Sequence, residues 1–528
     1  MRRWNGWGDT SVHHPLPETA VAALTERIGA GQPRRDATLE EVVARVPASR
    51  LPAHPLVSTE AELRVRHARG QSFEDLIALR SGQIPAFPDG VAFPQSNEDV
   101  RTLLNYAREV GARLIPYGGG TSVVGHINPE PGDAPVLTVS LERLQQLHSL
   151  SEEDRLATFG AGVSGPRLEE QLRTRGYTLG HFPQSFELST LGGWIVTRSR
   201  GQQSLGYGRI ENMFVGGRLE APVGTLMLPS LPATSTGLDI RELVLGSEGR
   251  MGLLTEATVR ISPLPEQESF HALIFPDWEK GRTAVRELVQ SGVPLSMLRL
   301  STPGETAINL SLSGHPRVVK LLSGALALRG IGAEGSMLVL GLSGGERRVE
   351  AGRKEALGLT GKHGAVRLPV LGGMWKKSRF RAPYFRNAAW ESGWGVDTVE
   401  TAAPWSVAPK LLEGLEGALR GALADQGEQV LAFTHLSHVY ATGSNLYTTF
   451  LFRLGASTEE THARWLALKT AASRAIVAHG GTISHQHGVG KDHKPYLQAE
   501  KGPLGIAAIR RVLETFDPTG LLNPGKLV

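Results

Sequence analysis

Short hydrophobic runs and helical repeats alternate along the chain, and their order predicts a protein that mixes strands and helices. The N-terminal part is irregular apart from two helical patterns, at Leu39–Val46 and Phe73–Arg80. Further along, a helix that Ser96 caps and that runs through Arg108 leads to a strand ending at Pro116. Other β signals occur at Val91–Pro94, Val136–Val139, Leu156–Phe159, Val244–Leu245 and Leu253–Ile261.

The pattern changes again at Pro263-Leu264-Pro265, and this break separates two predicted domains. Beyond it, helical and β signals alternate over long segments such as Trp278–Leu288 and Leu446–Leu454. A segment rich in His, Gly and Lys begins near Gly480, and a helix through Ile506–Phe516 follows it. The predicted units are an N-terminal helical and irregular segment (residues 1–85), an α+β domain (86–265), a second domain (266–479) and a C-terminal segment that returns to the first domain (480–528).

Composition and charge narrow the class of protein. With 528 residues, 40% of them hydrophobic, the chain is long enough for several cores. Lys and Arg number 56 against 52 Asp and Glu, a surplus too small to indicate a nucleic-acid partner. The lack of cysteine excludes disulfides, thiol nucleophiles and thiolate metal sites. No apolar stretch approaches ~20 residues, and the start from Met1 to Gly8 lacks the core of a secretory signal, so cytoplasmic residence is expected.

A run of three glycines follows the predicted strand Ala112–Ile115 and is the clearest chemical signal in the chain. Glycines adopt positive φ without steric cost, so their N–H groups can converge on an anion, and the following hydroxyls add donors. The spacing matches neither the G-x-G-x-x-G turn nor the G-x-x-x-x-G-K-[ST] loop. An ordinary glycine-rich turn is the alternative to a diphosphate cradle, which would indicate a flavin. The predicted cofactor-binding residues here are Pro116, Tyr117, Gly118, Gly119, Gly120, Thr121 and Ser122.

Four further segments offer hydroxyl groups and closely approaching backbone. In the last of them, Ser484–Lys491, His485 and His487 stand two residues apart in a glycine-bounded loop, where a functional role is favoured over packing. No third metal ligand lies nearby in the sequence, although His435 or His493 would complete a site by approaching in space, and no metal is predicted. The other three segments extend the predicted cofactor site: Gln184, Ser185, Phe186, Glu187, Leu188, Ser189 and Thr190; Thr197, Arg198, Ser199 and Arg200; and Gly246, Ser247, Glu248, Gly249, Arg250, Met251 and Gly252.

The order of these motifs resembles that of the vanillyl-alcohol-oxidase/PCMH flavoproteins, from about Pro88 to Lys526. The resemblance implies an α+β fold, with a PCMH-type FAD-binding domain of two α+β subdomains at 86–265. It also implies an α+β cap domain with an antiparallel sheet, which binds the substrate, at 266–479. FAD is expected to be non-covalent, because no histidine lies inside the Gly118 loop. Within the superfamily the chain resembles most the alkyldihydroxyacetonephosphate synthases, in a bacterial form, through Trp4-Asn5-Gly6-Trp7-Gly8, Gly192-Gly193-Trp194, Glu400-Thr401, Ala403-Pro404-Trp405 and the His-rich segment.

The resemblance implies a transfer without net redox change, a step of ether lipid synthesis. The flavin N5 adds to the carbon of acyl-dihydroxyacetone phosphate, a fatty acid leaves and a fatty alcohol replaces it. The implied partners are a lipid phosphate and a fatty alcohol, with no nucleic acid. A peripheral membrane contact and a homodimer are compatible with this function.

The resemblance also assigns roles to single residues. Tyr447 matches a proton-transferring tyrosine, Arg386 a substrate-binding arginine and Arg299 an arginine needed for activity; His485 and His487 match two of three adjacent histidines. A phosphomonoester suits a guanidinium fork, and removing a carbon-bound proton needs a positioned base. We expect neighbouring histidines or arginine to lower the pKa of Tyr447. Taken alone, a tyrosine in an apolar strand and an arginine beside aromatics are more often structural.

Two departures from the family pattern keep alternatives open. Gln486 replaces the middle histidine and can only hydrogen-bond, and Ser301 stands where an aspartate often occurs. The first alternative is an FAD-linked D-2-hydroxy-acid dehydrogenase of the D-lactate or glycolate type. Those enzymes carry a metal-binding histidine where this chain has Tyr447, and a glutamate where it has Gln486. The second is a non-catalytic flavin-binding protein, which would not need this polar set.

Overall fold

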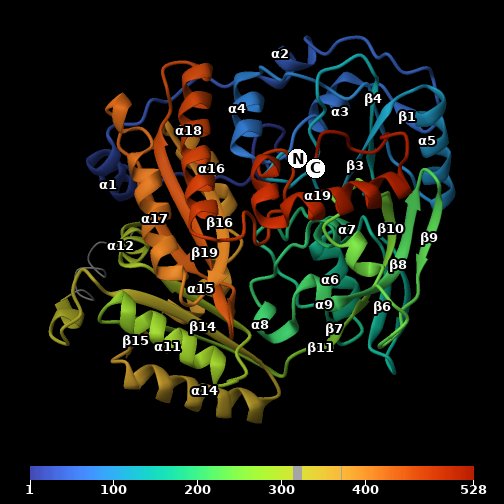
Figure 1. Ribbon diagram of the computed structural model, residues 1–528. Helices are drawn as coiled ribbons and strands as arrows, with labels where there is room; N and C mark the ends of the chain where they lie inside the picture. The colour runs from blue at the N-terminus through green and yellow to red at the C-terminus, as the bar shows by residue number, and fades with distance from the viewer. Residues whose placement is uncertain (313–323, 370) are drawn as a thin grey trace.

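Three principal sheets organise the protein, which is represented by a computed structural model that describes residues 1–312, 324–369 and 371–528. Two smaller sheets lie on the right of Figure 1, and one large sheet lies on the left with its own helices. Strands and helices are mixed throughout, and the sheet of the second half is antiparallel. The predicted α+β class is therefore confirmed.

The first sheet has the strand order β1-β2-β4-β3 and presents the glycine loop at one edge. Helix α5 (Asn97–Glu109) precedes β3 and begins as predicted, because Ser96 Oγ accepts the Asp99 N–H at 3.0 Å. Strand β3 ends at Tyr117, so the glycines leave the sheet at the carboxyl end of that strand. The strands are β1 (Val57–Ser58), β2 (Gly90–Ala92), β3 (Arg113–Tyr117) and β4 (Val136–Ser140).

The second sheet is antiparallel, in the order β5-β6-β10-β8-β9, and packs against α6, α7 and α9. Val244 ends the short helix α10 (Arg241–Val244), so the β signal predicted at Val244–Leu245 is wrong. Both residues are buried, and an isolated apolar pair does not distinguish a strand from a buried helical turn. The elements are β5 (Leu147–Ser151), β6 (Leu156–Gly160), α6 (Gly165–Arg173), α7 (Leu191–Thr197), α8 (Ser204–Tyr207), α9 (Ile210–Met213), β8 (Phe214–Ala221), β9 (Gly224–Leu228) and β10 (Leu253–Arg260); β7 (Tyr177–Thr178) pairs separately with β11 (Ser262–Pro263).

The large sheet has the order β15-β12-β14-β13-β17-β19-β16, and short β18 pairs with β19. Figure 1 shows α11 and α14 along one end of this sheet and α17 and α18 along the other. The strands are β12 (Gln267–Phe275), β13 (Met297–Ser301), β14 (Ser336–Gly344), β15 (Val366–Arg367), β16 (Trp394–Pro404), β17 (Leu431–Leu436), β18 (Val439–Tyr440) and β19 (Gly443–Arg453). The helices are α11 (Trp278–Gln290), α12 (Pro303–Leu312), α14 (Glu346–Lys362), α15 (Leu371–Ser378), α16 (Ala382–Glu391), α17 (Ala408–Gly421), α18 (Thr458–Ala478) and the 3-10 turn η1 (Ala424–Gln426).

The two faces of the large sheet differ in character because successive side chains of a strand point to opposite sides. One face buries residues such as Val399, Leu446 and Phe450 under α11, α14, α17 and α18. The other face carries polar and charged side chains, among them Tyr447 and Arg299, which line a cavity. The sheet therefore serves as a core on one side and as the wall of a binding site on the other.

The C-terminal end of the chain folds back onto the second sheet, and helices of the N-terminal segment contact helices of the large sheet. Helix α19 (Leu497–Phe516), preceded by η2 (Lys494–Tyr496), runs across the middle of Figure 1 to the right-hand half, where Leu513 and Leu527 enter the core of the second sheet. At the N-terminus, α1 (Glu18–Ile28) contacts α12 and α4 (Phe73–Ser81) contacts α18. Strand β1, which was not predicted, lies in the same N-terminal segment, as do α2 (Leu39–Val43) and α3 (Ala61–Arg66). None of the helices in the described ranges is long and apolar enough to cross a membrane.

Candidate active site

The glycine loop lies against the loop of residues 184–190 so closely that only glycine fits. A Cβ atom on Gly119 would stand 1.8 Å from the backbone oxygen of Leu188, and one on Gly118 would stand 2.4 Å from Thr190 Oγ1. Gly120 has φ +65°, which favours glycine on conformational grounds as well. The two loops therefore form a rigid, narrow wall of backbone groups.

This wall lines a cavity of about 670 Å³, whose opposite side is built by the large sheet and by α16. The volume is typical of a site for a small molecule or cofactor. The cavity joins the glycine loop to Tyr447, Arg386 and His487, which are far apart in the sequence. Of the predicted cofactor residues, the cavity is lined by Pro116, Tyr117, Gly118, Gly119, Gly120, Thr121, Ser122, Gln184, Ser185, Ser189, Thr190, Thr197, Ser199, Arg200, Glu248, Gly249 and Gly252.

The remaining predicted cofactor residues point elsewhere. Arg198 forms an ion pair at 2.6 Å with Glu242, and Arg250 donates to the carbonyl oxygens of the C-terminal segment. Phe186 and Met251 belong to the core of the second sheet. Outside the cavity lining are Phe186, Glu187, Leu188, Arg198, Gly246, Ser247, Arg250 and Met251.

Glu248 ties the glycine loop to the His-rich segment. Its carboxylate accepts the N–H groups of Val489 at 2.5 Å and Gly490 at 2.8 Å. The same carboxylate lies 3.1 Å from His126 Nε2, and His126 Nδ1 lies 2.8 Å from Ser122 Oγ. His126 lines the cavity but was missed in the sequence, where its one signal is its position six residues after the last glycine of the run.

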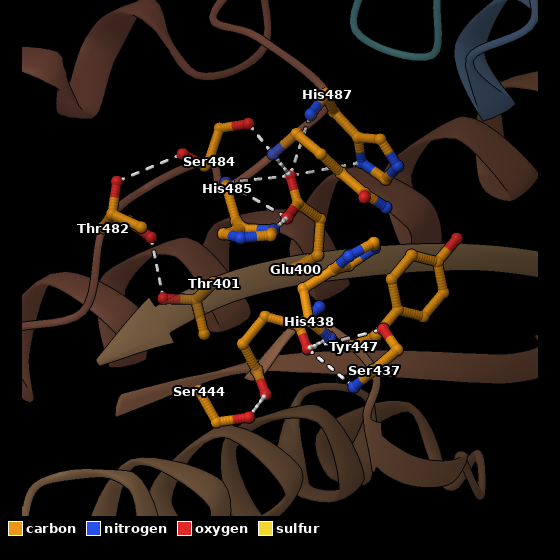
Figure 2. Close-up of polar contacts among 12 residues, drawn as sticks. Glu400, Thr401, Ser437, His438, Ser444, Tyr447, Thr482, Ser484, His485 and His487 are labelled. Carbon is orange, nitrogen blue, oxygen red and sulfur yellow. Dashed lines mark hydrogen bonds and ion pairs between the residues drawn. The ribbon is translucent and has the colours of Figure 1, made fainter. Parts of the chain in front are cut away.

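Glu400 of β16 holds the His-rich loop in place from the large sheet (Figure 2). One of its oxygens accepts the backbone N–H groups of His485, Gln486 and His487 at 3.0, 2.9 and 3.0 Å and the Ser484 hydroxyl at 3.0 Å. Burial by itself raises the pKa of this carboxyl. The adjacent histidines and N–H donors lower the pKa by more than burial raises it, so the pKa lies well below 4.5. Glu400 therefore stays ionised as the anchor of the loop.

The two predicted histidines have different surroundings. His487 lines the cavity, and burial lowers its pKa below 6.5, so its imidazole is neutral at neutral pH. His485 does not line the cavity, because its Nε2 atom lies 2.6 Å from the Tyr440 hydroxyl and its ring packs beside His438. Figure 2 shows Glu400 between the two. The structure therefore directs one histidine into the cavity and the other into the polar packing behind it.

Tyr447 lies in the centre of a row formed by three paired strands. Its register partners are Glu400 on β16 and His435 on β17. Its ring stacks on His435 at 5.0 Å between centroids and meets His487 edge-on at 5.9 Å, while its hydroxyl reaches Thr398 Oγ1 at 3.4 Å. Burial, together with the nearby carboxylates of Glu400 and Asp397, raises the pKa of Tyr447 to about 12, although the Thr398 hydrogen bond and Arg386 lower it. The expectation of a lowered pKa is wrong, because desolvation of the phenol outweighs the effects of Arg386 and of the Thr398 hydrogen bond.

Arg299 is held by a carboxylate that sequence reasoning missed. Glu305 Oε1 accepts from Arg299 Nη2 at 2.6 Å and lies 2.9 Å from His435 Nδ1. Burial raises the pKa of Glu305, but His435 and Arg299 lower it to about 2. Burial and Arg299 lower the pKa of His435 below 6.5, although Glu305 raises it, and its Nδ1 atom lies 2.9 Å from Glu305 Oε1 and 3.2 Å from Arg299 Nη2. His435 is therefore engaged by Glu305.

Arg386 lines the cavity, and its guanidinium is only partly hydrogen-bonded. Its Nη1 donates to the backbone oxygen of Gln71 and its Nε to that of Val396 at 3.3 Å. Within the described part of the chain, its buried Nη2 has no hydrogen-bond partner, and Asp397 stands 3.9 Å away. Among the described residues, no group of three or more His, Asp or Glu side chains is arranged to hold a metal. The unpartnered guanidinium nitrogen of Arg386 suits an anion.

Comparison with known proteins identifies relatives over the whole chain. Residues 88–227 match the family described as FAD binding domain, and residues 264–527 match FAD linked oxidases, C-terminal domain. Alkyldihydroxyacetonephosphate synthase of Dictyostelium discoideum is 29% identical over 100% of this chain and 93% of the relative. The synthase of Caenorhabditis elegans is 30% identical, covering 89% of this chain and 81% of the relative.

A solved structure of an alkyldihydroxyacetonephosphate synthase has a TM-score of 0.85 at 26% identity, covering 100% of this chain and 99% of that one. A more distant relative is the mitochondrial cytochrome-linked D-lactate dehydrogenase of Arabidopsis thaliana, 25% identical over 89% of this chain and 78% of the relative. The similarity to the synthases therefore includes the N-terminal segment as well as both domains.

The two-domain fold and the cavity between glycine loop and large sheet define an FAD-linked enzyme of the PCMH type, and the chain belongs to the FAD linked oxidase family. Its cofactor is FAD. Within this superfamily the chain is an alkyldihydroxyacetonephosphate synthase-like member.

The residues present fit FAD. The backbone of Gly118, Gly119 and Gly120 borders the cavity where a side chain would not fit, and it offers N–H donors to a diphosphate. Thr190, Thr197 and the other cavity-lining residues named above supply hydroxyl and backbone groups along the rest of the cavity.

Replacing Gly119 with alanine is expected to weaken FAD binding by tenfold or more, because the new Cβ would meet the Leu188 oxygen at 1.8 Å and push the two loops apart. Gly132→Ala is the matched control, since a Cβ there meets nothing within 4 Å. Flavin fluorescence titration of the two apoproteins measures the effect. Equal FAD affinity in Gly119→Ala and wild type would show that this loop is not the cradle.

Proposed function

We propose that this protein exchanges the acyl group of acyl-dihydroxyacetone phosphate for a fatty alcohol, which forms an ether-linked lipid precursor. The bond between the dihydroxyacetone carbon and the acyl-bearing oxygen breaks, and the fatty acid leaves with that oxygen. The alcohol oxygen forms a new bond to the same carbon, and the alcohol proton is released. No electrons are transferred overall. When bound, FAD supplies an electron-poor ring system that stabilises the reacting carbon.

The observation that carries this proposal is the polar row across β16, β19 and β17, in which Tyr447 and His435 line the cavity that the glycine loop also lines, while Glu400 anchors the His-rich loop beside them. Glu400, Tyr447 and His435 are register partners in that row. A tyrosine in its centre offers a proton to an oxygen atom, which supports acid–base chemistry at a substrate carbonyl. The synthases that are similar over the full chain support the same activity.

The protonation states of Tyr447 and His487, which both line the cavity, assign separate roles to these two residues. Tyr447 keeps its proton at neutral pH, because its pKa is about 12, and is assigned as the proton donor. His487 is neutral at the same pH and is assigned as the proton acceptor. Their rings are 5.9 Å apart between centroids, so one substrate can meet both. Arg386 is assigned to the substrate phosphate, since its Nη2 has a free N–H.

An anaerobic absorbance experiment on the FAD-loaded protein tests the proposal. Palmitoyl-dihydroxyacetone phosphate is added to one sample and D-lactate to another. We expect the flavin band to bleach only with the first compound and to return, with release of an ether product, when hexadecanol is added. Bleaching by D-lactate that an electron acceptor reverses would make the protein a dehydrogenase, and a bound flavin that responds to neither would make it non-catalytic.

Arg386→Lys is expected to raise the KM for the acyl phosphate substrate about tenfold while FAD content stays unchanged, because an ammonium is a point donor where the guanidinium is a planar fork. The exposed Arg420, which pairs with Glu416 on α17, provides the control substitution Arg420→Lys. Initial rates over a range of substrate concentrations measure the effect. Equal KM values in the variant and the wild type would remove Arg386 from phosphate recognition.

A further inference from the structure

The N-terminal motif Trp4-Asn5-Gly6-Trp7-Gly8 has no role in the function proposed so far, yet it forms part of the cavity. Trp7 lines the cavity and is only 5% exposed. Its indole Nε1–H is buried and has no hydrogen-bond partner among the described residues. An unsatisfied buried donor is costly, so one on a residue that lines a binding cavity indicates a ligand acceptor.

The backbone of this motif is clamped to helix α16 immediately beside Arg386. Asn387 Nδ2 donates to the Trp7 carbonyl oxygen at 2.9 Å, and the Trp7 N–H donates back to Asn387 Oδ1 at 3.1 Å. Gln71 adds a second link, because its backbone oxygen accepts from Arg386 and its side chain reaches the Gly6 carbonyl oxygen at 3.4 Å. Trp7 and Arg386 therefore share neighbours on both sides.

The glycines of the motif allow this close approach. A Cβ on Gly6 would stand 2.5 Å from Asn387 Oδ1, and one on Gly8 would stand 2.3 Å from the ring of Tyr384. Gly8 also has φ +85°. The motif is therefore shaped to bring the Trp7 indole against α16, and Trp4 serves a separate purpose as a packing residue beside Val42 and Leu79.

The charges around the two free donors favour an anion. Among the residues that the structure describes, neither Arg386 Nη2 nor Trp7 Nε1 has a hydrogen-bond partner, and both atoms are buried. The nearest acid, Asp397, stays 3.9 Å from Arg386 and is bound through its other oxygen by Trp465 Nε1–H at 2.8 Å. An oxyanion with several acceptor oxygens satisfies a guanidinium and an indole N–H together.

We propose that Trp7 and Arg386 jointly bind the phosphate of the substrate, so that the N-terminal segment completes the active site. This inference rests on the proposed function for the identity of the phosphate ester. The indole ring shields the site from water while its N–H fixes one phosphate oxygen. The segment from Met1 to Asp9 is thereby a specificity element, because substrates without a phosphate leave both donors unpaired.

Binding of dihydroxyacetone phosphate to the FAD-loaded protein, followed by calorimetry, tests the inference without turnover. Trp7→Phe keeps the ring and removes the N–H, and it is expected to weaken binding about tenfold while FAD content is unchanged. Trp4→Phe, in the same motif but outside the cavity lining, is expected to bind like the wild type. Combining Trp7→Phe with Arg386→Lys is expected to cost less than the sum of the single effects, because both residues bind one group.

Equal affinity in Trp7→Phe and the wild type overturns the inference, and so does a wild type that does not bind the phosphate ester. Loss of FAD in Trp7→Phe also overturns it, since the indole would then face the cofactor. The absorbance experiment with palmitoyl-dihydroxyacetone phosphate judges the proposed function separately. A protein that binds dihydroxyacetone phosphate through Trp7 but gives no ether product would keep the phosphate site and lose the transferase.

Discussion

Tyr447→Phe is expected to lower turnover about a thousandfold while FAD remains bound, within the ~10²–10⁴-fold range of a lost general acid. The substitution removes a single hydroxyl from a residue that is otherwise held by its ring, through stacking on His435 at 5.0 Å and an edge contact with His487 at 5.9 Å. The one hydrogen bond lost is a long one, 3.4 Å to Thr398. The fold and the cavity should therefore survive unchanged.

Tyr440→Phe is the matched control for this prediction. Tyr440 likewise contacts a histidine, since its hydroxyl lies 2.6 Å from His485 Nε2, but it lies outside the cavity lining. Steady-state rates with palmitoyl-dihydroxyacetone phosphate and hexadecanol, together with the flavin content of each variant, separate chemistry from cofactor loss. A Tyr447→Phe protein that turns over at the wild-type rate would remove this residue from the mechanism.

Glu400→Gln is expected to destabilise the protein by about 3–5 kcal/mol, the cost of breaking a buried charge network. The carboxylate accepts N–H groups from three successive residues, and an amide would turn an NH₂ donor toward some of them. The His-rich loop would lose its anchor, and His487 would leave its place beside Tyr447. Activity should therefore fall together with stability.

Denaturant unfolding of the FAD-free protein measures this loss without a contribution from cofactor binding. Glu350→Gln serves as the comparison, because Glu350 is 58% exposed and pairs only with Arg353 on the surface of α14, where such pairs contribute little. A loss below about 1 kcal/mol in Glu400→Gln, comparable to a surface pair, would show that the loop is held by other contacts.

The pH dependence of stability distinguishes the ionised carboxylate from a merely well-packed one. Because the folded pKa of Glu400 lies well below its ordinary value of 4.5, this group stabilises the fold fully above the unfolded pKa. That contribution is lost as the pH falls through the folded pKa. Unfolding free energies of the wild type should therefore decrease more steeply in acid than those of Glu400→Gln.

Local patterns in the sequence predicted the elements that depend on near neighbours. The Ser96 cap of α5 and the strand before the glycine run follow from residues within one or two turns of each other. The strand predicted at Val244–Leu245 was wrong, because two adjacent apolar residues are too few to show the periodicity of a strand or of a helix. The order of the motifs along the chain was sufficient to indicate the family and its cofactor.

The contacts that decide chemistry in this site join residues far apart in the chain. Glu305 holds Arg299 and His435, and no feature of the sequence indicates that pairing. Arg198 belongs to a predicted cofactor segment, but it turns outward to Glu242 at the end of α7. The spacing of residues in the sequence does not predict which way a side chain points at the end of a helix, where Arg198 lies.

The sequence by itself determined the α+β class, the glycine loop and the set of residues able to do acid–base and anion chemistry, because these depend on residue type and local order. Only the tertiary structure decided that His487 and not His485 lines the cavity, that Trp7 is hydrogen-bonded to Asn387 beside Arg386, and that Tyr447 keeps its proton. The physical reason is that burial, register and the direction of a side chain are set by packing between distant segments. The same packing determines the pKa of each group.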